Sequence, residues 1–292
     1  MPDVTCLTTV VFDLGGVLID WDPRHLYRQL FEDPDEMESF LAEVTTAEWN
    51  GHQDAGRPWA EAIEILVAEY PERRELIEAF HRRWPEMLAG EIPGTVDVLA
   101  ELGTAGVRLV ALSNWSAEMF PVALERFEFL ASFEGIVISG EIGVNKPDRR
   151  IFEHLTQRFG IGPEDAVFVD DSGANVDAAT DFGFCAIQFT DATALRLALV
   201  RLGLLPDVRL VPNGRTEPLV RREVSGVDNH AGTGSDRPHC CAAALDSERA
   251  KHGGVFQADA PRSEAGRFRQ ADPETGPMAR DVRAAAYPRT VR

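Results

Sequence analysis

Basic charge, cysteine and long apolar runs are all scarce in this sequence. Against 48 Asp and Glu residues stand only 29 Lys and Arg, and the formal net charge of −19 argues against binding to nucleic acids or to anionic membranes. No run of about eighteen apolar residues occurs, so we expect no membrane-spanning helix. The amino terminus lacks the basic segment and cleavage site of a signal peptide, and we therefore expect a cytoplasmic protein.

The four cysteines have none of the spacings that bind zinc or form a disulfide framework. Cys6 and Cys185 lie in apolar stretches, and we expect them to be small core residues. Cys240 and Cys241 lie in a region without apolar periodicity. This pattern favours a reducing compartment.

Short apolar runs alternate with helical patterns over residues 9–205. The runs are rich in Val, Ile and Phe, as strands buried on both faces should be, and cover residues 9–14, 107–113, 135–139, 165–170 and 184–189. The helical patterns between them cover residues 95–106, 116–127, 148–160 and 174–183. This alternation predicts an α/β fold with a parallel sheet that helices cover on both faces.

One segment interrupts the alternation. Residues 22–91 are helical in pattern throughout, which is too long for a single crossover and predicts a separate helical module, the cap. Because it leaves the core directly after the first strand, the cap would lie over the carboxyl ends of the strands. The core would comprise residues 1–21 and 92–206. Residues 207–292 are rich in Gly, Arg, Asp and Pro without periodicity, and we expect them to be disordered.

Four short motifs contain the polar residues that a catalytic site needs. In chain order they are FDLGGVL with Asp13, LSNWS with Ser113 and Asn114, NKPDRRIF with Lys146, and VDDSGANVDAA with Asp170 and Asp171. Because the carboxyl ends of parallel strands meet at one edge of a sheet, we expect these side chains to share a cleft. Lys146 stands out as one of only two lysines in the chain.

The order and content of these motifs resemble the haloacid dehalogenase-like (HAD) hydrolase superfamily over about residues 7–205. Within it, the chain resembles members with a cap inserted after the first motif. The run VDDSGANVDAA is similar to the fourth motif of sugar-phosphate phosphatases and of the phosphatase domain joined to mammalian epoxide hydrolase. The resemblance implies a Rossmann-like, doubly wound parallel sheet with an inserted all-helical cap. It also implies a phosphatase acting on a small phosphorylated metabolite, with a sugar phosphate as the favoured class.

The resemblance assigns a role to each motif. Asp13 is the nucleophile, Ser113 and Asn114 bind the transferring phosphoryl group, Lys146 steadies that group, and Gly16 lets the backbone pass close to it. An aspartate can attack a phosphate monoester and form an aspartyl-phosphate, which divides a difficult hydrolysis into two steps. The ammonium group of Lys146 would lower the pKa of Asp13 and neutralise charge on the phosphoryl oxygens.

A metal ion completes the implied site. Two anions repel each other as the nucleophile approaches the phosphate, so a cation must bridge them, and Mg²⁺ suits carboxylate and phosphate oxygens. By the family pattern Asp13, Asp171 and the backbone carbonyl of Gly15 hold this ion. Asp170 is either a further ligand, through water, or the residue that orients Asp171.

Gly15 departs from the family pattern, in which an aspartate usually stands at this position as general acid and then base. Losing such a group typically costs about 10²–10⁴-fold in rate. Asp20, Asp22 and His25 follow close by, at the root of the cap, and are candidates to replace it.

Three functions therefore stay open, of which the Mg²⁺-dependent phosphatase is favoured. A 2-haloacid dehalogenase would use the same aspartate to attack carbon and would need no metal. The pair Asp170–Asp171 argues against this function, and Gly15 argues mildly for it. The third is a phosphate-binding protein with weak turnover, which Gly15 alone supports. We expect a monomer or a homodimer.

Overall fold

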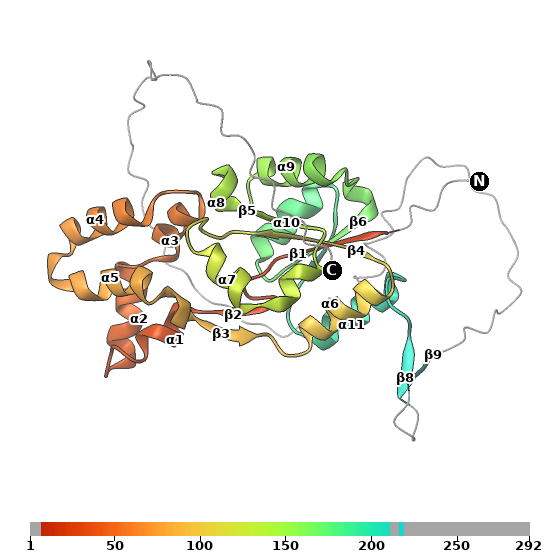
Figure 1. Ribbon diagram of the computed structural model, residues 1–292, viewed down its shortest axis with the longest axis horizontal. Helices are drawn as coiled ribbons and strands as arrows, with labels where there is room; N and C mark the ends of the chain where they lie inside the picture. Colours follow the sequence, from red (N-terminus) through yellow and green to blue (C-terminus); the bar gives the residue numbers. More distant parts are fainter. Residues whose placement is uncertain (1–6, 211–215, 219–292) are drawn as a thin grey trace, which may run out of the picture. The chain divides into compact units, whose positions relative to one another are not determined.

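The computed structural model describes residues 7–210 and 216–218. A five-stranded parallel sheet of order β5-β4-β1-β6-β7 lies at the centre of the core (Figure 1). Its strands are β1 (Thr9–Phe12), β4 (Arg108–Ser113), β5 (Gly135–Ile138), β6 (Ala166–Asp170) and β7 (Cys185–Gln188). The five predicted strands and the α/β class are confirmed.

The central strand β1 is buried on both faces. Val10 and Phe12 belong to one hydrophobic cluster and Val11 to the other, because successive side chains of a strand point to opposite faces. All three are fully buried. This double burial explains why the strands read as continuous apolar runs rather than as alternating ones.

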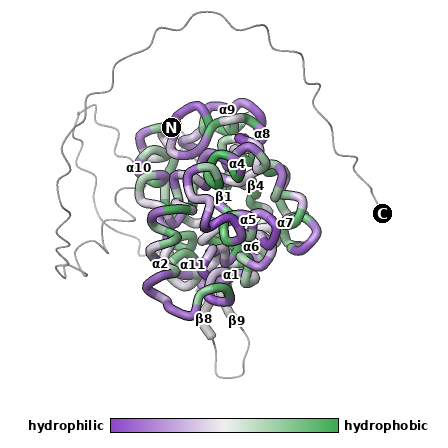
Figure 2. The backbone as a smooth tube through the Cα atoms, turned by 90° about the vertical axis from the view of Figure 1, so that its left-hand side faces the viewer, coloured by the Kyte–Doolittle hydropathy of each residue, from purple (hydrophilic) through white to green (hydrophobic). Residues whose placement is uncertain are grey.

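Helices cover both faces of the sheet. The core helices are α6 (Thr95–Thr104), α7 (Phe120–Arg126), α8 (Ser139–Ile142), α9 (Arg149–Phe159), α10 (Gly173–Phe182) and α11 (Ala192–Arg201), with short 3₁₀ turns η3 (Glu128–Ser132) and η4 (Pro163–Asp165). Side chains of α6, α7 and α11 join the cluster around Phe12, and those of α9 and α10 join the cluster around Val11. In Figure 2, hydrophobic and hydrophilic stretches alternate along the chain, as expected of helices with one buried face.

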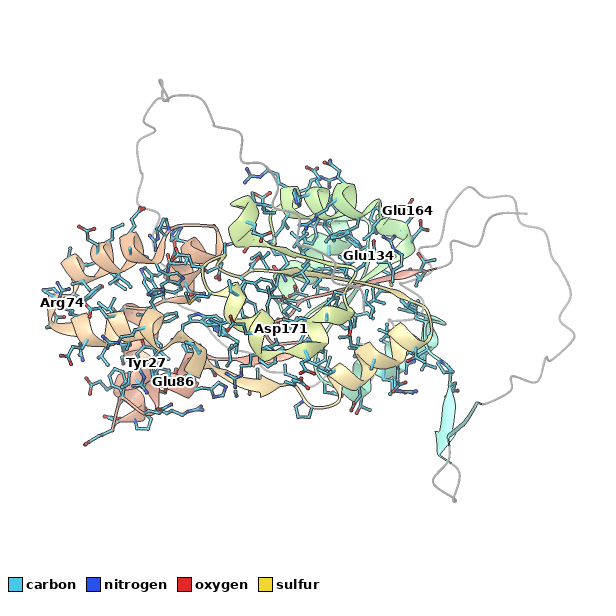
Figure 3. All side chains as sticks on the ribbon, in the orientation of Figure 1. Tyr27, Arg74, Glu86, Glu134, Glu164 and Asp171 are labelled. Carbon is cyan, nitrogen blue, oxygen red and sulfur yellow. The ribbon has the colours of Figure 1, made fainter. Side chains whose placement is uncertain are left out.

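The cap is inserted between β2 (Ile19–Trp21) and β3 (Leu88–Glu91), which pair antiparallel as a two-stranded ribbon. Its helices are α1 (Pro23–Tyr27), α2 (Pro34–Glu43), α3 (Ala47–Asp54), α4 (Trp59–Glu69) and α5 (Arg74–Arg82), with 3₁₀ turns η1 (Pro71–Arg73) and η2 (Trp84–Met87). The elements of segment 22–91 are thus helical except for β3, and short loops connect them. Figure 3 labels Tyr27 and Arg74 in this part of the chain.

Aromatic side chains form the centre of the cap. The ring centroids of Trp49, Trp59 and Phe80 lie 5.2–5.6 Å apart, with Trp49 edge-on to both others. Tyr27 packs on Phe40 at 5.2 Å. Such aromatic pairs contribute about 0.5–1.5 kcal/mol beyond the area that they bury. These side chains belong to the same hydrophobic cluster as Phe12 of the sheet, so the cap is packed onto the core.

Several expectations concern residues beyond the core and cap. In the tail predicted to be disordered, 207–292, two short strands, β8 (Val208–Leu210) and β9 (Thr216–Pro218), pair antiparallel. Apart from 207–210 and 216–218, the tail lies outside the described residues.

Among the described helices, none has both the length and the apolar character needed to cross a membrane. Cys185 is buried as expected, but it is disulfide-bonded, which the cysteine spacing did not predict.

Candidate active site

The register of the sheet brings the first and second motifs together. Phe12 of β1 is level with Ala111 of β4 and with Val169 of β6, so Asp13 emerges between the ends of both neighbouring strands. The backbone N–H of Asp13 donates to the oxygen of Val169 at 2.8 Å. Ser113 Oγ donates to Asp13 Oδ1 at 2.7 Å, so a strand-end hydroxyl fixes the orientation of this carboxylate.

Lys146 lies in the loop between α8 and α9, and its side chain is fully buried. Its Nζ contacts Asp13 Oδ2 at 2.8 Å, Asp170 Oδ2 at 2.7 Å and the backbone oxygen of Leu112 at 2.9 Å. Three N–H donors thus meet three acceptors, and the ammonium group is satisfied. Burial alone would lower the pKa of Lys146, but the charges of Asp13 and Asp170 outweigh it and raise that pKa.

The carboxyl group of Asp13 lies in a buried place. Only 7% of the residue is exposed. Burial raises the pKa of Asp13, the charge of Lys146 opposes that shift, and the charge of Asp170 adds to it. Desolvation and like charge therefore both disfavour the ionised form, and the single ammonium group balances them in part.

Asp170 and Asp171 are adjacent in sequence but differ in their surroundings. Asp170 is fully buried, with Oδ2 on Lys146 and Oδ1 accepting from the N–H of Ser172 and from Asn175 Nδ2, both at 2.9 Å. Asp171 is exposed, on the loop after β6 (Figure 3). Burial of its carboxyl group and then the charge of Asp170 raise the pKa of Asp171.

Three carboxylates converge at this edge of the sheet. One oxygen each of Asp13, Asp170 and Asp171 lies within 4.8 Å of the others. Lys146 is the cation that contacts two of them in the described part of the chain. The group therefore has an excess of negative charge, and oxygen donors in this arrangement fit a hard divalent cation.

The two glycines after Asp13 serve different needs. Gly16 has a φ of +73°, which favours glycine, and a Cβ there would lie 2.4 Å from Asp171 Oδ2. Its N–H donates to the backbone oxygen of Ile19 at 3.0 Å. A Cβ on Gly15, in contrast, would meet no atom within 4 Å. The local structure thus requires glycine at position 16 but leaves room for a side chain at position 15.

Asn114 holds the main chain of Lys146. Asn114 Oδ1 accepts from the N–H of Lys146 at 2.8 Å, and its Nδ2 donates to the backbone oxygen of Lys146 at 3.0 Å. The amide thus positions the loop that presents the ammonium group. That Ser113, Asn114 and Gly16 bind a phosphoryl group stays a prediction, since each already has a partner within the protein.

The residues suggested to replace a carboxylate at Gly15 contact one another at the root of the cap. Asp20 Oδ1 lies 2.9 Å from His25 Nε2. Asp22 is the N-cap of α1 and accepts from the N–H of Arg24 at 2.8 Å. All three residues therefore form part of the connection between core and cap.

Asp54, the last residue of α3, was not identified from the sequence. Burial raises its pKa to about 7, a hydrogen bond from the backbone of Ser116 opposes that shift, and the charge of Asp13 adds to it. The electrostatic influence of Asp13 places Asp54 in the neighbourhood of the site. No motif marks it, because only the docking of the cap brings it there.

Known proteins resemble this chain in sequence and in fold. A sesquiterpene phosphatase of Aspergillus oryzae is 25% identical over 198 residues, which cover 68% of this chain and 97% of that protein. An (S)-2-haloacid dehalogenase of Burkholderia cepacia is 24% identical over 201 residues, covering 63% of this chain and 84% of that protein. The magnesium complex of a HAD family enzyme from Bacteroides thetaiotaomicron superposes with a TM-score of 0.52 at 22% identity, covering 63% of this chain and 94% of that one.

The family itself follows from the match to its sequence model. The pattern of the haloacid dehalogenase-like hydrolases matches residues 7–183, more than half of the chain. This stretch contains all four motifs together with the cap. The protein therefore belongs to the haloacid dehalogenase-like hydrolases.

Proposed function

We propose that this hydrolase is a Mg²⁺-dependent phosphatase that cleaves the phosphate monoester of a small metabolite through an aspartyl-phosphate on Asp13. The observation that supports it most is the charge of the site, where Asp13, Asp170 and Asp171 converge and Lys146 supplies a single balancing cation. A dehalogenase has no need of such an excess of carboxylates. A sugar phosphate is the substrate class to test first, because VDDSGANVDAA is similar to the fourth motif of sugar-phosphate phosphatases.

The chain's own residues fit a bound Mg²⁺ ion. Asp13, Asp171 and the backbone carbonyl of Gly15 would hold it, and Asp170, which is fully buried and contacts Lys146 Nζ at 2.7 Å, would orient that ammonium group. When bound, the ion would draw the phosphate toward the nucleophile and neutralise its charge.

The remaining residues prepare the nucleophile. Hydrogen bonds from Ser113 Oγ and from the N–H of Leu14, both at 2.7 Å, hold Asp13 Oδ1, and Lys146 holds Oδ2. A carboxylate held in this way approaches the phosphorus atom in a defined orientation, which removes an entropic cost from the attack. The ammonium group would then face the phosphoryl oxygens as negative charge develops on them.

The function can be tested with a panel of phosphorylated metabolites, each assayed with Mg²⁺ and with EDTA. We expect phosphate release that requires Mg²⁺ and returns when the metal is added back. Halide release from 2-haloacids, measured in parallel with EDTA present, would instead identify a dehalogenase. No release of either ion would favour the protein that binds phosphate with weak turnover.

Gly16→Ala is expected to weaken the response to Mg²⁺. The added Cβ must displace the carboxylate of Asp171, and a non-glycine residue in the left-handed region also costs about 1–2 kcal/mol. The matched control is Gly106→Ala, where φ is +79° and a Cβ would meet no atom within 4 Å. Both variants should lose similar stability on thermal unfolding, but only Gly16→Ala should need more Mg²⁺ for half-maximal activity. Equal Mg²⁺ requirements would show that Asp171 is not a ligand.

A further inference from the structure

Asp54 ends helix α3 at the junction between the cap and the core. Its carboxyl group accepts hydrogen bonds from Asn50 Nδ2, at 2.9 Å, and from the backbone N–H of Ser116. Ser116 belongs to the loop after β4, and Ser113 at the end of β4 is hydrogen-bonded to Asp13. One short stretch of the core therefore holds both the cap carboxyl group and the carboxylate of the nucleophile.

The junction around this carboxyl group is fixed by further hydrogen bonds. Ser139 Oγ donates to the backbone oxygen of Asp54 at 2.5 Å, and Asn145 Nδ2 donates to a backbone oxygen of α3 at 2.6 Å. Trp59 Nε1 donates to Ser116 Oγ at 3.0 Å. The core therefore contributes hydrogen bonds to the end of α3 that carries Asp54.

We propose that Asp54 is the proton donor and acceptor of the hydrolysis, in place of the carboxyl group that Gly15 lacks, an inference that rests on the proposed phosphatase function. Asp54 is half-buried and lies within electrostatic reach of Asp13. A carboxyl group that titrates near neutral pH can both give up and take back a proton during turnover.

The proton then follows a closed cycle. As an oxygen of Asp13 bonds to phosphorus, the bond from phosphorus to the alcohol oxygen breaks, and Asp54 gives its proton to the departing alkoxide. In the second step the ionised Asp54 takes a proton from water while the water oxygen bonds to phosphorus. The bond from phosphorus to Asp13 breaks, inorganic phosphate leaves, and both carboxyl groups return to their starting states.

The other acidic groups near the cap are less suited to this role. Asp20 is engaged with His25, and its side chain is 49% exposed. Asp22 caps α1 and pairs with Arg24. Both carboxyl groups are therefore engaged within the connection between core and cap.

Asp54→Asn tests the proposal with p-nitrophenyl phosphate and phenyl phosphate as substrates. Because p-nitrophenolate leaves without a proton, the variant should still form the aspartyl-phosphate from it and release a burst of one equivalent of p-nitrophenol. Steady-state turnover should fall by about 10²–10⁴-fold, since no base activates water. Phenolate needs the proton, so phenyl phosphate should give no burst.

Two further variants separate a proton-transfer role from a structural one. Trp59→Phe removes the hydrogen bond to Ser116 at the same junction without removing a carboxyl group, and should slow both substrates equally with no burst. Gly15→Asp has room for its side chain and, added to Asp54→Asn, should restore at least about tenfold of the lost turnover.

The outcomes are distinct for the two proposals. Unchanged turnover in Asp54→Asn, or an equal loss on both substrates without a burst, would overturn the role of Asp54 while leaving the phosphatase intact. Wild-type protein that releases no phosphate and forms no phosphoenzyme would overturn the phosphatase function itself. A burst restricted to p-nitrophenyl phosphate, with rescue by Gly15→Asp, supports both.

Discussion

Asp13→Asn is expected to lower phosphate release by about 10⁴-fold or more, the scale on which enzymes lose rate when their nucleophile is removed. The amide keeps the shape of the side chain, and Ser113 Oγ and the N–H of Leu14 keep an oxygen to donate to. It cannot form the acyl-phosphate, however, and the covalent route is closed. Steady-state phosphate release from the most active substrate of the panel gives the measurement.

A direct test of the covalent step accompanies the rate. Wild-type protein quenched in acid during turnover of a ³²P-labelled substrate should retain label on the chain, and Asp13→Asn should retain none. The control is Asp97→Asn, which removes an aspartate from the first turn of α6. Label that persists in Asp13→Asn would show that another residue is the nucleophile, whereas loss of rate in Asp97→Asn would point to a general effect of charge.

The sequence was sufficient to predict the framework of the site. Strands buried on both faces are continuous apolar runs, so β1, β4 and β6 were recognisable. Parallel strands then bring their carboxyl ends to one edge, which predicted that Asp13, Ser113 and Asp170 would meet. The convergence depends only on the register of the sheet, and local patterns encode that register well.

The remaining features depend on how loops and modules pack, which local patterns do not encode. The hydrogen bonds between the amide of Asn114 and the main chain of Lys146 are set by two loops and were not predicted, whereas phosphate binding by Asn114 stays a prediction. Asp54 lies at the end of α3, a helix whose residues show little apolar periodicity, and it reaches the site only through the docking of the cap. The ribbon of β2 and β3 was missed because its strands are short and partly exposed.

Helix α7 illustrates a smaller difference with a local cause. The pattern predicted a helix over residues 116–127, but the helix begins at Phe120, with Pro121 in its first turn. Proline is favoured at that point and disfavoured further inside a helix. The preceding residues instead form the turn in which Ser116 contacts Trp59 and Asp54, so the shorter helix leaves this loop free to meet the cap.

Lys146→Met is expected to lower the free energy of unfolding by about 3–5 kcal/mol and to abolish phosphate release, because it leaves buried carboxylates without their cation. Asp170 is fully buried, and the backbone oxygen of Leu112 would also lose its donor. Since the fold raises the pKa of Lys146, its contribution is fully present below the lysine's ordinary pKa and is lost only as the pH rises through the raised value. Denaturant unfolding at neutral pH therefore measures the full effect.

The matched control is Arg150→Met, which removes a cation from an exposed pair with Asp148 at 2.7 Å. Exposed pairs contribute about 0–1 kcal/mol, so this variant should unfold almost as the wild type does. Adding Asp170→Asn to Lys146→Met removes the more deeply buried of the two unpaired carboxylates and should recover more than half of the lost stability without restoring activity. A loss below about 1 kcal/mol in Lys146→Met, or no recovery in the double variant, would show that the buried ion pair is not what the fold depends on here. Recovery of stability without activity would separate the two roles of Lys146, since the fold needs its charge to be balanced whereas the reaction needs the ammonium group itself.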